Sequence, residues 1–230
     1  MRYLIGEASW AGVDVATRLA ASGILLTRTD CPEHFHLYHE MEAHDLAIID
    51  SKLLDQGPSL RHLRSSAPNV PICVVVHGND PDERAALLRA GADLVLPNDL
   101  SYEELHARLC ALARRAHGLS TPYVQAGPLL LNLWARTAHL NGTRLALAPK
   151  LYETMEFLAL RQQQVVTRDQ LLSHVYVPGE EPGPRIFDVY MNALRSHFAP
   201  FGDQIAIVTH RGVGFRMVVA SAQAVEAAVA

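Results

Sequence analysis

The sequence predicts two domains: an α/β domain built on a doubly wound, five-stranded parallel sheet, and a smaller α+β winged-helix domain after it. The chain has 230 residues, which is enough to bury two separate cores. Its first half alternates short apolar runs with amphipathic stretches, a pattern typical of a parallel sheet covered by helices on both faces. After a break in composition, the second half runs from small strands to helices to a closing hairpin. This is the order of elements in a winged helix.

Five apolar runs predict the strands of the first domain. They are Tyr3–Ile5, Gly23–Thr27, Leu46–Ile49, Ile72–Val76 and Leu94–Leu96. The amphipathic stretches between and after these runs predict five helices. The helices are Val13–Ala21, Glu33–Glu42, Ser59–Ser66, Pro81–Ala90 and Tyr102–Ala116. Local signals agree, because Asp80 followed by Pro81 is typical of a helix start and Gly91 of a helix end.

The break between the two domains follows Arg114 and Arg115. Residues 116–122 lose the helical period and collect Gly, Ser and Pro. We therefore place a first domain at 1–117, a linker at 118–123, a second domain at 124–220 and a tail at 221–230.

The second domain begins with a small antiparallel sheet. Two alternating runs, Leu129–Trp134 and Thr143–Leu147, flank Asn141-Gly142, which is typical of a type I′ hairpin turn. Helical spacing then predicts three helices and a closing hairpin. These are Leu151–Arg161, Arg168–Val175 and about Pro184–Phe198, and then the strands Ile205–Thr209 and Phe215–Val219.

Composition excludes several classes of protein. No run approaches the roughly twenty apolar residues of a membrane span, and Met1–Ile5 leads into a strand pattern without a secretion signal, so we expect no membrane partner and a cytoplasmic protein. The three cysteines, Cys31, Cys73 and Cys110, are scattered, which suits reduced thiols. We find no GxSxG, HExxH or Walker string and therefore expect neither an enzyme nor a cofactor.

The charge of the chain is uneven. Residues 1–120 carry 11 Lys and Arg against 16 Asp and Glu, a net charge of −5. Residues 121–230 carry 9 against 8, a net charge of +1. Because nucleic-acid phosphates attract basic surfaces, any DNA-binding face must be a local one in the second half.

Several strings in the second half resemble the effector domain of OmpR/PhoB response regulators. They are Ala148–Glu153, Val165–Leu172, Phe187–Val189, Leu194-Arg195 and Arg211–Arg216. The resemblance covers most of residues 124–219 and is strongest to the CtrA branch of the family. The first half resembles a CheY-like receiver domain, with Asp45–Asp50 at the third strand and Arg89–Asp93 before the fifth. The resemblance implies a two-component regulator that binds double-stranded DNA.

A working receiver holds Mg²⁺ with two acids and offsets the charge of the phosphoryl group with a lysine. By the resemblance, Asp50 stands at the phospho-acceptor position and Glu7 at the first acid. The second acid is Ala8, the hydroxyl position is Val76 and the lysine position is Asn98. We therefore expect a regulator that does not depend on phosphorylation. The alternative is a conventional regulator phosphorylated on Asp50, and whether a histidine kinase acts on it stays open.

The resemblance also implies a homodimer formed by the fourth helix, fifth strand and fifth helix of the receiver. Arg84 with Glu104, and Asp93 with Arg115, match expected ion pairs across the dimer axis, with apolar residues such as Ala86 and Leu109 between them. The alternative is that these charges are simply solvated. The expected interface residues are Arg84, Leu87, Asp93, Leu94, Glu104, Arg108 and Arg115.

For DNA, the resemblance implies that the third effector helix enters the major groove and the closing hairpin enters the minor groove. Phe187, Met191, Leu194 and Phe198 recur at helical spacing and should face the core. The expected DNA contacts are Thr167, Arg168, Arg185, Val189, Asn192, Arg195 and Arg211. With so few basic residues, we expect two effector domains on repeated half-sites. By the same resemblance, the loop Tyr176–Gly183, which includes the two acids Glu180 and Glu181, corresponds to the segment that contacts RNA polymerase in the OmpR/PhoB family.

One competing reading is a metal-sensing or small-ligand-sensing regulator. Neutral imidazoles bind Zn²⁺ and Cu²⁺ well. The histidines gather near the second helix with a cysteine, at Cys31, His34, His36, His39 and His44. No familiar closed zinc pattern is present, so we expect no metal.

Overall fold

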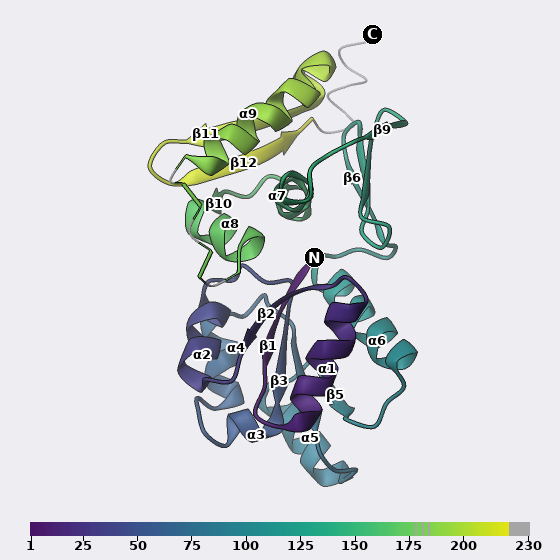
Figure 1. Cartoon of the computed structure of the whole chain (residues 1–230), viewed down its shortest axis with the longest axis vertical. Helices are drawn as coiled ribbons and strands as arrows, with labels where there is room; N and C mark the ends of the chain where they lie inside the picture. The colour runs from purple at the N-terminus through teal and green to yellow at the C-terminus, as the bar shows by residue number, and fades with distance from the viewer. Residues whose placement is uncertain (178, 181, 184, 221–230) are drawn as a thin grey trace. The chain divides into compact units, whose positions relative to one another are not determined.

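A computed structural model describes residues 1–177, 179–180, 182–183 and 185–220. The chain divides into two compact units, Met1–Gly118 and Leu119–Ala230 (Figure 1). The predictions that fall on Glu181, on Pro184 as a helix start and on the tail at 221–230 lie outside the described residues.

The first unit is a parallel sheet of five strands in the order β2-β1-β3-β4-β5, which confirms the predicted doubly wound, CheY-like fold (Figure 1). All neighbouring strands pair in parallel, and the chain reverses direction of winding at β1. The strands are β1 Arg2–Gly6, β2 Leu25–Thr29, β3 Leu46–Asp50, β4 Ile72–Val76 and β5 Leu94–Pro97.

Helices cover both faces of this sheet and divide its core into two layers. The layer on one face joins α1 (Trp10–Ala21) and α6 (Tyr102–Ala116) to alternate strand residues such as Ile5 and Ile48. The layer on the other face contains the intervening residues of the same strands, such as Leu4. The helices on that face are α2 Pro32–Glu40, α3 Ser51–Leu54, α4 Leu60–Ser66 and α5 Pro81–Ala90. The strands read as continuous apolar runs because both of their faces are buried.

Some element bounds differ from the prediction for local reasons. Helix α1 begins three residues early, at Trp10, because the Ser9 side chain accepts a hydrogen bond from the Gly12 N–H. Strand β2 begins at Leu25 because Gly23 has φ of +84° in the turn that follows α1. Helix α3, which has four residues, was not predicted, because a single turn leaves no periodic signal.

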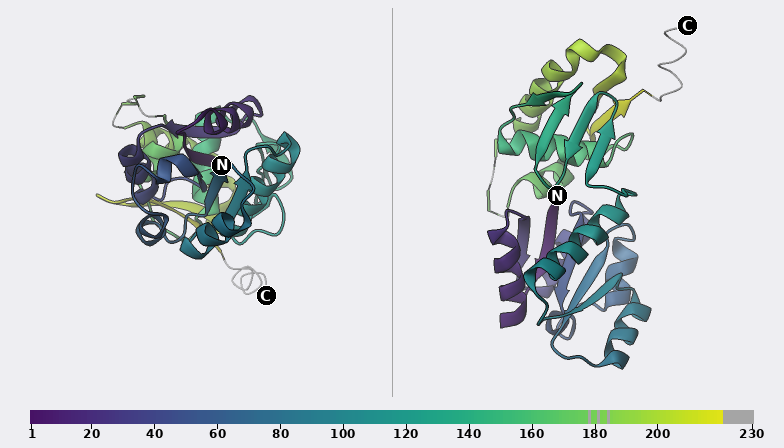
Figure 2. Two further views of the ribbon diagram at one scale, coloured as in Figure 1. Left: turned by 90° about the horizontal axis from the view of Figure 1, so that it is seen from below. Right: turned by 90° about the vertical axis from the view of Figure 1, so that its right-hand side faces the viewer.

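The second unit begins with a four-stranded antiparallel sheet in the order β6-β7-β8-β9, drawn in teal in the right-hand view of Figure 2. Its strands are β6 Tyr123–Ala126, β7 Leu129–Asn132, β8 Thr137–Leu140 and β9 Thr143–Leu145. Asn141 and Gly142 have φ of +49° and +80°, as a type I′ turn requires, and they join β8 to β9. The prediction recognised this turn but missed β6 and β8.

Three helices and a second antiparallel sheet complete a winged helix, as predicted. The helices are α7 Pro149–Leu160, α8 Arg168–Val175 and α9 Ile186–Phe198, followed by the short helix η1 Ala199–Gln204. The sheet has the order β10-β12-β11, with β10 Val166–Thr167, β11 Ile205–His210 and β12 Gly214–Val219. Glycine is needed at position 214, because a Cβ there would lie 1.9 Å from the backbone oxygen of Val166. Among the described helices, none is long and apolar enough to cross a membrane.

Candidate nucleic-acid interface and receiver pocket

The polar side chains of the first unit gather where its parallel strands end. Glu7 follows β1, Asp50 ends β3 and His77 follows β4. The carboxyl ends of parallel strands meet at one edge of the sheet, so residues far apart in the sequence become neighbours there.

The side chain of Asp50 is fully buried, and both of its oxygens are engaged. Ser9 donates its hydroxyl to Oδ2, while Oδ1 accepts from His77 Nε2 at 2.7 Å and from the Lys52 backbone N–H at 3.0 Å. Because an ionised carboxylate only accepts, the proton of the imidazole lies on Nε2. Burial favours the neutral acid, but the hydrogen bonds from Ser9, His77 and Lys52 outweigh it and hold the pKa of Asp50 below its ordinary value.

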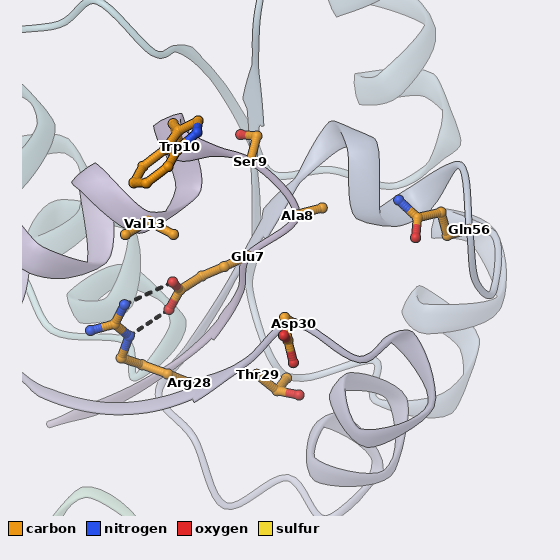
Figure 3. Close-up of a pocket in the computed structure, with 9 residues that line it drawn as sticks. All are labelled: Glu7, Ala8, Ser9, Trp10, Val13, Arg28, Thr29, Asp30 and Gln56. Carbon is orange, nitrogen blue, oxygen red and sulfur yellow. Dashed lines mark hydrogen bonds and ion pairs between the residues drawn. The ribbon is translucent and has the colours of Figure 1, made fainter.

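Glu7 is also engaged, by a residue of β2. Arg28 donates Nε to Glu7 Oε1 at 2.5 Å and Nη2 to Oε2 at 2.8 Å, the forked pair drawn in Figure 3. Glu7 is 8% exposed, so the guanidinium neutralises a buried charge. The hydrogen bond to Glu7 raises the pKa of Arg28 above its ordinary value.

The remaining positions of the expected phosphorylation pocket carry no suitable groups. Ala8 packs against the apolar layer under the sheet and supplies no oxygen, and Val76 is fully buried in that layer. Asn98 is exposed, and its backbone N–H bonds to the Val76 carbonyl. Mg²⁺ needs several free oxygen ligands, whereas here one acid is missing and Glu7 is taken by Arg28. The residues present do not fit a magnesium ion.

A cavity of about 660 Å³ opens beside the Glu7–Arg28 pair (Figure 3). The indole of Trp10 lines it and is 89% exposed. The other lining residues are Glu7, Ala8, Ser9, Val13, Arg28, Thr29, Asp30 and Gln56.

The histidines near the second helix do not form a metal site. His39 is buried and bonds through Nε2 to the Leu63 carbonyl at 3.0 Å, while His44 is buried against Thr27. Burial lowers the pKa of His39 to about 4 and that of His44 to about 3. Within the described ranges, no three His, Cys, Asp or Glu side chains lie close enough to hold a metal ion.

The expected DNA-reading helix is α9, and its apolar face lies as predicted. Phe187, Met191, Leu194 and Phe198 are all buried. On the outer side, Val189 is 59% exposed and Asn192 is exposed, and Arg185 is exposed at the start of the helix. The side chains of Arg185 and Val189 are open to a partner, while Asn192 Oδ1 accepts a long hydrogen bond of 3.5 Å from Arg195 Nη1.

Two of the arginines expected to contact DNA also have partners within the domain. Arg195 donates Nε to the Ile207 carbonyl at 3.0 Å and Nη2 to Thr209 Oγ1 at 2.7 Å. Arg168 pairs with Asp188 at 2.6 Å and stacks over the ring of Phe215. Arg195 thereby joins α9 to β11, and Arg168 joins α8 to α9 and β12. Both side chains stabilise the arrangement of the elements that form the expected DNA-binding face.

The start of α8 and the tip of the closing hairpin complete the face. Thr167 and Gln170 form a capping box, in which Thr167 Oγ1 accepts from the Gln170 N–H and Gln170 Oε1 accepts from the Thr167 N–H. Arg211 is exposed in the turn between β11 and β12, where Gly212 has φ of +74°. Between described residues, the side chains of Arg185 and Arg211 make no ion pair or hydrogen bond.

Comparison with known proteins decides the family. The family described as "Transcriptional regulatory protein, C terminal" matches residues 142–217. The two-component response regulator PhoP of Pseudomonas aeruginosa is 32% identical over 202 residues, which cover 86% of this chain and 89% of PhoP. The chain belongs to the OmpR/PhoB family of response regulators.

This OmpR/PhoB regulator is also similar to a second curated relative and to a solved structure. The cell cycle transcriptional regulator CtrA of Caulobacter vibrioides is 29% identical over 198 residues, 85% of this chain and 86% of CtrA. The solved structure of DrrB, an OmpR/PhoB homologue of Thermotoga maritima, is 22% identical, covers 94% of this chain and 98% of its own, and has a TM-score of 0.42. The match to the transcriptional regulatory family and the similarity to PhoP and CtrA support the statement that the chain is a response regulator of a DNA-binding transcription regulator family.

On the receiver face expected to dimerise in this OmpR/PhoB regulator, four of the charged side chains have partners within the chain, namely Arg84, Asp93, Glu104 and Arg108. Asp93 pairs with Arg64 of α4, and Glu104 pairs with Arg108 on α6 at 2.6 Å. Arg84 donates to Asn79 Oδ1 at 3.0 Å. Leu87 and Leu94 are half-buried and Arg115 is exposed. The prediction for Leu109 was wrong, because this residue is fully buried in the core under α6.

Sequence reasoning missed the residues that close the pocket. Ser9 and His77 lie 41 and 27 residues from Asp50, and Arg28 lies 21 residues from Glu7. The sequence analysis considered only the positions that carry functional groups in typical receivers, and Ser9, Arg28 and His77 do not stand at those positions. The available signal was an imidazole directly after the buried strand that neighbours Asp50.

Proposed function

We propose that this regulator binds promoter DNA without phosphorylation of Asp50. The observation that carries the proposal is that both acids of the receiver pocket are already bound by the chain's own side chains, Glu7 by Arg28 and Asp50 by Ser9 and His77.

Phosphoryl transfer to an aspartate needs a free carboxylate oxygen and cations around the phosphoryl group. Here, Asp50 Oδ1 accepts two hydrogen bonds and Oδ2 accepts one. Binding of Mg²⁺ beside Glu7 would break the forked pair between Glu7 and Arg28. The ion would then have too few oxygen ligands from the protein, because Ala8 supplies none. A histidine kinase would therefore find no usable acceptor at this position.

In the proposed DNA complex, α9 lies in the major groove and presents Arg185, Val189 and Asn192. Arg211 at the hairpin tip enters the minor groove. The free N–H groups at the start of α8 receive a phosphate beside Thr167. Because few basic side chains remain unpaired, one effector domain binds weakly, and two domains bind repeated half-sites.

We further propose that the receiver forms a homodimer through α5, β5 and α6 without a phosphate signal. Half-buried Leu87 and Leu94 and the 48%-exposed Leu88 supply apolar contact area. Pairing Arg84 with the partner's Glu104 exchanges an exposed intrachain pair for an interchain one, at little cost, since such pairs are worth at most about 1 kcal/mol.

The loop between α8 and α9 is the proposed contact with RNA polymerase. Glu180 on this loop pairs with Lys150 at 3.4 Å, and Lys150 also donates to the Val175 carbonyl. These bonds attach the described part of the loop to α7. The Glu180 side chain is therefore held near the start of α7.

The test of phosphorylation independence is incubation with acetyl phosphate and Mg²⁺, followed by intact mass measurement. We expect no phosphoryl adduct on the native chain. As a positive arm, the variant Ala8→Asp/Arg28→Ser/Val76→Thr/His77→Ala/Asn98→Lys removes Arg28 from Glu7 and His77 from Asp50 and supplies the missing acid, hydroxyl and lysine. This variant should gain an adduct that Asp50→Asn removes. An adduct on the native chain that disappears in Asp50→Asn would contradict the proposal.

A further inference from the structure

The cavity beside the Glu7–Arg28 pair lies at the edge of the receiver sheet where the parallel strands end. Its volume of about 660 Å³ is that of a site for a small molecule (Figure 3). The lining residues follow β1, begin α1 and end β2, next to the strand at which the winding reverses. In open α/β sheets, this is where ligands bind.

One wall of the cavity is an uncovered aromatic ring. The side chain of Trp10 is 89% exposed, and Val13 lies one helical turn further along α1. Both line the cavity, and Figure 3 draws them on the same side of it. Among the described residues, no ring or cation packs on the indole. This wall therefore offers an apolar ring a surface on which to pack.

The cavity keeps one negative charge. Its charged side chains are Glu7, Arg28 and Asp30. Glu7 and Arg28 offset each other through their forked pair. The carboxylate of Asp30 is exposed and has no hydrogen bond or ion pair with a described residue. Residues 1–120 carry a net charge of −5, so the surrounding field has the same sign.

We infer that this cavity binds a small organic cation, an amine whose apolar ring packs on Trp10 and whose ammonium group lies near Asp30. An ammonium donates hydrogen bonds to a carboxylate, and the face of an indole attracts cations. In Figure 3, Trp10 and Asp30 lie on opposite sides of Glu7. A ligand that contacts both needs its ring and its charge at different ends, as in an arylalkyl ammonium ion.

The rival ligand is an anion bound by Arg28. Nη1 of Arg28 takes no part in the pair with Glu7, so it would be available to a carboxylate. An anion there would also meet the carboxylate of Glu7, which already offsets the guanidinium charge. The attraction left for an anion is therefore weak. Probes of equal shape and different charge separate the two ligand classes.

The experiment is a titration of the full-length chain, followed by the fluorescence of Trp10. The chain has two tryptophans, so Trp134→Phe leaves Trp10 as the single reporter. The probe is 3-phenylpropylammonium, and its matched controls are the anion 3-phenylpropionate and the neutral 3-phenylpropan-1-ol. For the ammonium we expect a saturable response with a Kd of about 1 mM or lower, and binding at least about tenfold weaker for both controls.

Two variants test the two anchors of the ligand. Asp30→Asn keeps the shape of the side chain and removes its charge, and it should raise the Kd of the ammonium about tenfold. Trp10→Ala removes the ring and should raise the Kd at least as much, measured by calorimetry because the reporter is lost. Thermal unfolding of each variant checks that the receiver is folded.

Asp14→Asn is the matched control for charge. It changes the net charge as Asp30→Asn does, but Asp14 pairs with Arg18 on α1 and does not line the cavity. We expect its Kd for the ammonium to stay within about twofold of the native value. Equal weakening in Asp14→Asn and Asp30→Asn would assign the binding to the overall charge and overturn the inference.

Three other outcomes overturn it as well. These are the lack of a saturable response to the ammonium below about 10 mM, equal or tighter binding of either control probe, and an unchanged Kd in Asp30→Asn or in Trp10→Ala. Tighter binding of 3-phenylpropionate would assign the cavity to anions held by Arg28. None of these measurements involves DNA, so the inference and the proposed function fail separately.

Discussion

Glu7 and Arg28 form the tightest charged pair of the receiver pocket, and its strength is measurable. Arg28→Ala leaves the buried carboxylate of Glu7 without its partner, and we expect a loss of about 1–3 kcal/mol in the free energy of unfolding. Urea denaturation of the full chain measures it. Replacement of the exposed Arg61 by Ala is the control and should change stability by less than about 0.5 kcal/mol. Equal losses in both variants would contradict the pairing.

Two buried histidines should make the receiver sensitive to acid. His39 and His44 have folded-state pKa values lowered to about 4 and about 3, below the ordinary value of 6.5. Between pH 6.5 and pH 4 the unfolded chain therefore binds more protons than the folded one, so stability is complete above pH 6.5 and falls as the pH is lowered. By pH 4 each histidine should cost about 3 kcal/mol.

Urea denaturation between pH 7 and pH 4 tests this expectation. His39→Gln should be less stable at pH 7 but lose less stability on acidification than the native chain. His34→Gln, at an exposed position, should follow the native pH dependence. An unchanged slope in His39→Gln would show that His39 is not the titrating group.

At the level of single elements, α8 depends on its cap. Thr167→Ala removes the hydroxyl that accepts the Gln170 N–H, and we expect a loss of about 1 kcal/mol. For a domain of this size, the midpoint of thermal unfolding should fall by about 4–8 °C. Thr167→Ser keeps the hydroxyl and should restore most of the loss. Equal midpoints for the Ala and Ser variants would show that the cap contributes little.

How well the sequence predicts an element depends on how local its signal is. Helix α6 and helix α8 have the predicted bounds, because a capping residue and a sustained helical period mark both. Strand β8 was missed, since its four residues show a pattern too short to separate from the preceding turn. The short β6 was assigned in part to the linker for the same reason.

In the candidate sites, too, features with a local sequence signal were predictable and features that depend on tertiary contacts were not. The buried face of α9 was predictable because its residues recur at helical spacing. The partners of Asp50 and of Arg195 were not, because a hydrogen bond between two strands, or between a helix and a hairpin, leaves no periodic trace in the sequence. Tertiary placement alone brings His77 to Asp50 and Thr209 to Arg195.

For the whole molecule, we expect the dimer to form without phosphorylation of Asp50. We expect the native chain to sediment as a dimer at micromolar concentration, with or without acetyl phosphate. Arg84→Glu places like charges opposite Glu104 and should shift the chain toward monomer. The swap Arg84→Glu/Glu104→Arg restores complementary charges and should restore the dimer. Native chain that sediments as a monomer would contradict assembly through this face.

The account predicts that DNA affinity is independent of phosphoryl donors. The most direct measurement is an anisotropy titration of one selected DNA site with the native chain, before and after incubation with acetyl phosphate and Mg²⁺ at fixed salt concentration. Because Asp50 and Glu7 are already engaged, we predict that the two Kd values agree within about twofold. A tightening of about tenfold that is absent in Asp50→Asn would contradict the account.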